Sequence, residues 1–92
     1  MSRPLAGGSL SAMPRFLIHH HHEPRECGVV FAAFRGHDSP LRRRPTLASC
    51  AFGDHRIWWS VHAESEAVAL GQLPFFVAER AIAIRVEEVQ IP

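Results

Sequence analysis

Four consecutive histidines, His19 to His22, follow a short hydrophobic run and are the first side chains in the sequence that suggest chemistry. If the run is a β-strand, His19 and His21 share one face, with their backbones about 7 Å apart. Two neutral imidazoles at that spacing can converge on a transition metal, and His62, expected on the same face of a neighbouring strand, can supply a third ligand. His20 and His22 then point toward the opposite face. The sequence therefore predicts a nickel or zinc site at His19, His21 and His62.

A small-molecule site is a second prediction for the same face of the expected sheet. Trp58, Ser60 and Ser49 offer an apolar floor with hydrogen-bonding groups, and Arg85 adds a cation. Arg85 can hold a carboxylate, and a histidine can transfer a proton near neutral pH. Three hypotheses follow. The protein binds a small ligand or metal without catalysis, or it is an isomerase-like enzyme with histidines as acid and base and Arg85 as anion clamp, or it is a structural interaction module.

The remaining reactive residues are interpreted as structural. Cys27 and Cys50 are too few for a disulfide scaffold, and their apolar surroundings favour buried, reduced thiols. Three consecutive arginines, residues 42–44, lack interleaved aromatic residues in the sequence, so we interpret them as a solvated loop.

Composition limits the class of protein. The chain has 92 residues, 47% of them hydrophobic, which favours one globular domain at residues 13–92 after a flexible leader at residues 1–12. The formal net charge of +1 gives no overall field that would attract nucleic acid or a membrane. No apolar run reaches transmembrane length, and residues 1–12 lack the apolar core of a signal peptide, so a cytoplasmic protein is expected.

The elements that must position these residues follow from the apolar pattern. We expect strands at residues 15–21, 46–52, 56–63 and 81–91, with helices at residues 24–36 and from the N-cap Ser65 to a break at Pro74. The order β-α-β-β-α-β predicts an α+β, ferredoxin-like domain, with both helices on one face of a four-stranded antiparallel sheet. In the last strand, Ile82, Ile84 and Val86 are expected to face the helices, and Ala83 and Arg85 the opposite face.

Two family resemblances support this layout. The stretch from Gly53-Asp54-His55 to Ser60-Val61, followed by Ser65-Glu66-Ala67 and Leu73-Pro74-Phe75-Phe76, resembles the muconolactone isomerase family. Residues 13–18 and 85–89 are similar to a family of small bacterial proteins, one of which binds nickel. Both families are dimeric α+β barrels, so the resemblance implies a homodimer in which two sheets face each other and enclose the site.

Overall fold

The structure of the chain is a computed structural model that describes residues 13–92. The predicted leader, residues 1–12, lies outside this described part. In chain order the elements are β1 (Arg15–His21), η1 (Pro24–Glu26, a 3-10 helix), α2 (Cys27–Ala32), β2 (Leu47–Ala48), η2 (Cys50–Phe52, also 3-10), β3 (Arg56–His62), α3 (Glu66–Leu70), α4 (Phe75–Ala78) and β4 (Ala81–Val86).

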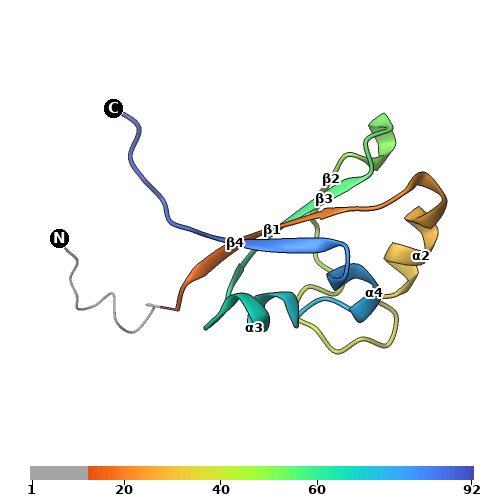
Figure 1. The fold of residues 1–92 in the computed structure, drawn as a ribbon, viewed down its shortest axis with the longest axis horizontal. Coiled ribbons are helices and arrows are strands. Elements are labelled where there is room, and N and C mark those ends of the chain that lie inside the picture. Colours follow the sequence, from red (N-terminus) through yellow and green to blue (C-terminus); the bar gives the residue numbers. More distant parts are fainter. Residues whose placement is uncertain (1–12) are drawn as a thin grey trace.

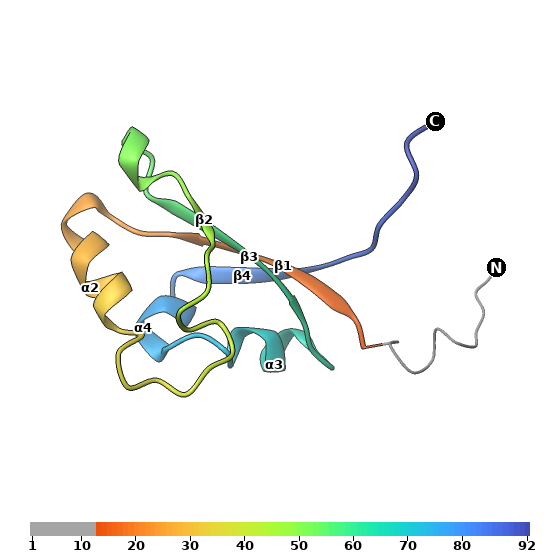
Figure 2. The ribbon, with the colours of Figure 1, turned by 180° about the vertical axis from the view of Figure 1, so that it is seen from behind.

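The four strands form one antiparallel sheet with the order β2-β3-β1-β4. Figures 1 and 2 show α2, α3 and α4 on the same side of this sheet, and no helix of residues 13–92 covers the other side. The predicted α+β class with a four-stranded antiparallel sheet is therefore confirmed. Within the same residues, none of the helices is long and apolar enough to cross a membrane.

The core lies between the sheet and the helices. In β1 and β3 every second residue is buried, as strand alternation requires, and Ile18 and Ile57 are completely inaccessible to solvent. These strands pack against Val30, Leu73 and Val77 from the helical layer. The same alternation sends the other side chains of β1 and β3 to the uncovered face of the sheet, which we call the outer face.

The predicted orientation of β4 is wrong. Ala83 is only 3% exposed and belongs to the core, whereas Ile82 and Ile84 are 56% and 49% exposed. Ile84 pairs with Leu17, an outer-face residue of β1, so the isoleucines lie on the outer face. Because this strand carries apolar residues on both sides, its sequence pattern alone does not decide which side faces the helices. The small Ala83 side chain lets the helical layer approach the sheet closely.

Three predicted element lengths are also wrong. The strand expected at residues 46–52 is paired only at Leu47–Ala48, and the chain then curls into η2. Ser49 causes the curl, because its hydroxyl contacts Asp54 Oδ2 at 3.2 Å and accepts a hydrogen bond from the backbone N–H of Arg56 at 3.1 Å. The last strand ends at Val86 instead of residue 91, and the first helix is two short pieces that end at Ala32.

The N-cap predicted at Ser65 is confirmed, because its hydroxyl accepts a hydrogen bond from the backbone N–H of Val68 at 3.1 Å. We expect Ser65→Ala to lower the free energy of unfolding by about 1 kcal/mol, since α3 loses a cap. Thermal or urea denaturation measures this loss. Ser65→Asp keeps a capping oxygen and should stay close to wild type; an equal loss in both variants would contradict the capping role.

Candidate metal centre

Four metal-ligating side chains converge at one end of the sheet: His22, Cys27, Cys50 and His55. His22 directly follows β1 and His55 directly precedes β3, and these neighbouring strands pair up to the rung His21–Arg56. A backbone hydrogen bond of 3.1 Å from His22 N to the His55 carbonyl continues the pairing by one rung. Cys27 is the first residue of α2 and Cys50 the first residue of η2, so each cysteine returns to the same strand end five positions from its histidine.

The geometry of this cluster fits a tetrahedral metal. The four ligand atoms all lie within 4.8 Å of one another, and His22 Nε2 is 3.6 Å from Cys50 Sγ. Zinc–sulfur and zinc–nitrogen bond lengths imply ligand separations of about 3.3–3.8 Å in a tetrahedral site, and about 3.6 Å for a nitrogen–sulfur pair. Small side-chain movements therefore suffice to close the cluster around an ion. Both cysteines are free thiols.

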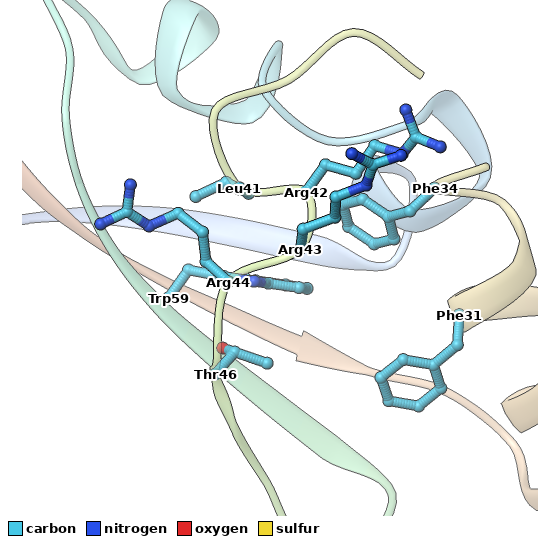
Figure 3. A pocket seen from close by; sticks show the side chains of 8 residues that line it. All are labelled: Phe31, Phe34, Leu41, Arg42, Arg43, Arg44, Thr46 and Trp59. Atoms are coloured by element: carbon cyan, nitrogen blue, oxygen red, sulfur yellow. The ribbon is translucent and has the colours of Figure 1, made fainter. Parts of the chain in front are cut away.

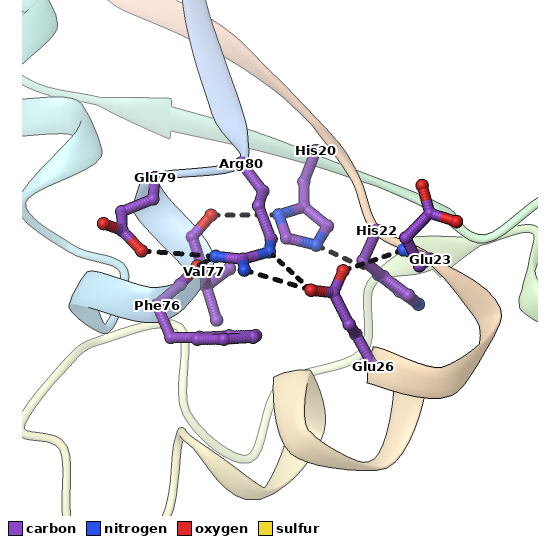
Figure 4. A network of polar contacts seen from close by, with 8 residues as sticks. All are labelled: His20, His22, Glu23, Glu26, Phe76, Val77, Glu79 and Arg80. Atoms are coloured by element: carbon purple, nitrogen blue, oxygen red, sulfur yellow. Dashed lines mark hydrogen bonds and ion pairs between the residues drawn. The ribbon is translucent and has the colours of Figure 1, made fainter.

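His20 fixes which nitrogen of His22 faces the cluster (Figure 4). The carbonyl of Val77 can only accept, so His20 Nδ1, at 3.0 Å, carries the proton and donates to it. In the neutral ring, His20 Nε2 is then an acceptor, and His22 Nδ1–H donates to it at 3.0 Å. The lone pair of neutral His22 is left on Nε2, the atom that faces Cys50. This arrangement, in which an outer hydrogen bond orients a ligating imidazole, is typical of metal-bound histidines.

His55 shows two signs of a site under constraint. Its backbone has a φ of 50°, in the left-handed region that few residues other than glycine adopt. Its Nδ1 is buried and has no hydrogen-bond partner among the described residues. Buried polar atoms are nearly always satisfied, so an orphaned nitrogen on a ring that belongs to this cluster fits a metal-ligating role for His55.

A charged network holds the start of α2, and therefore Cys27, against the sheet (Figure 4). Arg80 donates to Glu26 Oε2 at 3.0 Å, and its guanidinium lies 3.7 Å above the centre of the Phe76 ring. The other Glu26 oxygen accepts from the backbone N–H of Glu23 at 2.9 Å. These bonds to Arg80 and Glu23 lower the pKa of the Glu26 carboxyl, which stays ionised beside Cys27.

Burial disfavours the charged forms of His22 and Cys50 in the cluster, and of His20 behind it. Burial lowers the pKa of His20 and of His22, and the neighbouring His55 lowers the pKa of His22 further. Burial raises the pKa of the Cys50 thiol, and its hydrogen bond with Cys27 adds to that rise. A bound divalent ion reverses this preference for the thiols, since a coordinating thiol is deprotonated.

The metal ligands predicted from the sequence lie elsewhere. His19 and His21 are on the outer face, and the His19 ring packs 5.8 Å from the Trp58 ring. His62 shares that face but pairs with Arg15, four positions along β1 from His19, which is roughly 13 Å away. The convergent group within residues 13–92 contains none of the three. Metal binding at His19, His21 and His62 stays a prediction.

The predicted small-molecule residues are only partly brought together. Trp58 and Ser60 line one groove of about 340 Å³ at the β2 edge of the outer face, whereas Ser49 and Arg85 do not line it. Ser49 is bonded within the η2–β3 turn. Arg85 has the orientation of the core residue Ala83, on the side of the sheet opposite His19. The isomerase-like hypothesis, which requires Arg85 beside the cleft histidines, gains no support from this placement.

None of the four clustered residues is among the metal ligands predicted from the sequence, which places His22 on the opposite face from its predicted site. The prediction that both cysteines are free thiols is confirmed. The prediction that they are buried among apolar side chains is wrong, since both are partly exposed and lie beside two imidazoles. One signal was present in the sequence: His22 precedes Cys27 by five positions, and Cys50 precedes His55 by five. That mirrored spacing places all four at one sheet end once strands 15–21 and 56–62 are paired.

No protein-family model, curated protein or solved structure matches the chain significantly.

His20 is expected to tune metal affinity without touching the metal. In His20→Leu, the buried Nδ1–H of His22 loses its acceptor, and zinc affinity should fall about 10–100-fold. Competition titration against a chromophoric chelator measures the change. His20→Gln offers both an acceptor and a donor and should recover part of the affinity, and His19→Leu is the matched control on the outer face. Unchanged affinity in His20→Leu would contradict the positioning role.

Proposed function

We propose that the protein binds one zinc ion through His22, Cys27, Cys50 and His55, as the structural centre of a small ferredoxin-like domain. The observation that carries the proposal is the convergence of two thiols and two imidazoles within 4.8 Å at one end of the sheet. Packing alone does not favour such a cluster, because each imidazole or thiol that is taken out of water carries a polar atom that needs a partner.

The ligand set favours zinc over nickel, the other metal considered. Two thiolates with two imidazoles in a tetrahedral arrangement are a common structural zinc set. Nickel(II) favours square-planar or tetragonal sites with nitrogen and oxygen ligands, whereas two of the four donors here are sulfur.

The four protein ligands favour a structural role over a catalytic one. Catalytic zinc keeps a coordination position open for water or substrate, whereas four protein ligands fill a tetrahedron. Here the ion would join the β1–α2 connection, through His22 and Cys27, to the η2–β3 connection, through Cys50 and His55. A bond network across these two connections would hold the short helices of a small domain in place.

Cobalt(II) substitution tests this proposal. We expect one Co²⁺ per chain, with the visible absorption of tetrahedral coordination and a thiolate-to-cobalt charge-transfer band. Zinc should displace the cobalt and remove both features. The double variant His19→Ala/His21→Ala is the matched control, because it removes two histidines of the same run from the outer face. Loss of the bands in that variant, or an octahedral spectrum in wild type, would overturn the assignment.

We also propose that a second copy of the chain covers the outer face. Leu17, Leu47, Ile82 and Ile84 are exposed there around Trp58, and an exposed group of large apolar side chains often marks an interaction surface. The chain continues beyond the end of β4, away from the sheet (Figure 1). Val89 and Ile91 are exposed on this segment, which could therefore contact a second copy through apolar side chains.

Light scattering tests the dimer. We expect twice the chain mass for wild type and a monomer for Leu17→Glu/Ile84→Glu, which places two charges in the middle of the outer face. Val68→Glu/Phe75→Glu changes two exposed apolar residues on the helical side and should remain dimeric. A monomeric wild type at micromolar concentration would overturn this part of the proposal and leave the metal centre untouched.

A further inference from the structure

A cavity of about 170 Å³ lies on the helical side of the sheet, between α2, β3 and the segment that leads into β2 (Figure 3). Its walls are the rings of Phe31, Phe34 and Trp59, together with Leu41 and Thr46. Arginines 42, 43 and 44 line the rest, and no acidic side chain contributes to the lining. An apolar cavity beside three cations has the composition of a site for an anion that carries an apolar body.

Within residues 13–92, the guanidinium groups of Arg42, Arg43 and Arg44 make no hydrogen bond or ion pair, unlike those of Arg15, Arg56 and Arg80. Arg43 has a φ of 65°, a left-handed backbone that is rare for a long side chain. Figure 3 shows the Arg42 and Arg43 side chains extending to the same side, toward Phe34, whereas Arg44 extends the other way past Leu41.

The segment that carries the arginines is anchored at both ends. Ser39 Oγ accepts from the backbone N–H of Leu41 at 3.1 Å, and the Ser39 carbonyl accepts from Arg42 N at 3.2 Å. At the other end, the Thr46 hydroxyl donates to the Trp58 carbonyl at 2.7 Å. The guanidinium groups therefore start from a positioned backbone, which reduces the entropy lost when they bind.

We propose that this cavity binds an aromatic carboxylate, with the ring among Phe31, Phe34 and Trp59 and the carboxylate on Arg42 and Arg43. The volume favours a single ring, since an apolar cavity of about 150 Å³ holds benzene. Residues 42–44 form a loop in which Arg43 and Arg44 are exposed, as the sequence predicts, and the fold adds aromatic neighbours that the sequence does not show. These aromatic residues are Phe31 of α2, Phe34 of the turn that follows α2, and Trp59 of β3.

The site adjoins the metal centre without depending on it. The Phe31 ring lies edge-on to the His22 ring, with their centres 6.4 Å apart, and forms the wall between the two. No ligand of the metal cluster lines the cavity. Ligand binding in the cavity can therefore be measured on the full chain with zinc present, and the result does not depend on how the cluster coordinates a metal.

The two tryptophans provide separate reporters for NMR, because each indole N–H gives its own signal. Trp59 lines the cavity and Trp58 does not. Titration with 4-methylbenzoate into the millimolar range should shift the Trp59 signal saturably and leave the Trp58 signal in place. Shifts of both signals would place the ligand in the outer-face groove, which both residues line, and would overturn the assignment. Absence of any saturable shift would overturn it too.

Matched probes and variants separate the two halves of the proposed ligand. The neutral analogue 4-methylbenzyl alcohol and inorganic phosphate should each bind at least about tenfold more weakly, because each lacks the charge or the ring. Phenyl phosphate binding more tightly than 4-methylbenzoate would overturn the choice of carboxylate. Arg42→Ser/Arg43→Ser should weaken 4-methylbenzoate binding by about tenfold or more. Arg35→Ser/Arg85→Ser removes the same amount of charge outside the cavity and should leave 4-methylbenzoate binding unchanged. An equal loss of affinity in this variant would mean that only net charge matters, and would overturn the proposed site.

Discussion

Replacement of Cys27 or Cys50 with serine is expected to abolish tight zinc binding and to lower the melting temperature of the zinc-loaded protein to that of the metal-free chain. Each substitution removes one of four convergent ligands. Even the loss of an outer hydrogen bond can cost a metal site about 100-fold in affinity, and a direct ligand contributes more than that. Zinc at about 1,000 times its Kd adds ~4 kcal/mol to the free energy of unfolding. For a domain of this size, that corresponds to a rise of roughly 15–30 °C in Tm.

Calorimetry or circular dichroism with and without zinc measures this difference. Metal-free wild type, prepared with a chelator, is the reference: Cys27→Ser and Cys50→Ser should match its Tm and should not respond to zinc. His22→Ala and His55→Ala should behave alike, whereas His62→Ala, on the outer face, should keep the full zinc response. If zinc raised the Tm of both serine variants as much as that of wild type, the ligand assignment would be wrong.

The parts of the fold that the sequence predicts correctly are those set by local rules. Alternation in residues 15–21 and 56–62 identifies two central strands, and alternate residues of both are buried, among them Phe16, Ile18 and Val61. The cap at Ser65 and the break at Pro74 depend on hydrogen bonds and sterics within a few residues, and both are confirmed.

The parts that the sequence does not predict depend on contacts between distant segments. The phase of β4 is decided by the pairing of Ile84 with Leu17, because both sides of that strand are apolar. The metal cluster is decided by the last rung of the β1–β3 pairing, where His22 meets His55. Strand alternation correctly separates His19 and His21 from His20 and His22. It does not show that the second pair faces the cysteines, because a two-residue period carries no information about neighbouring loops.

Acidification from about pH 7.5 to 5.5 is expected to release zinc and, separately, to destabilise the metal-free protein. Zinc binding requires both cysteines as thiolates, and burial already raises the pKa of the Cys50 thiol. Each proton that zinc displaces lowers its apparent affinity about tenfold per pH unit, so two thiols predict a fall of about 100-fold per unit. Chelator competition at a series of pH values measures the slope, and a dye titration at neutral pH should detect the displaced protons.

The loss of stability in the metal-free protein follows from the two buried imidazoles. The pKa values of His20 and His22 are lowered in the folded state, so their contribution to stability is complete above the unfolded value of 6.5. It is lost as the pH falls from 6.5 through their lower folded values, because the unfolded chain binds protons first. Urea denaturation of chelator-treated protein measures this loss. His19→Ala/His21→Ala should keep the same pH dependence, since those side chains lie outside the core. Stability that increased between about pH 7 and 5.5 would mean that the His20–His22 pair is protonated in the folded protein, and the hydrogen-bond relay that directs Nε2 of His22 toward Cys50 would then be wrong.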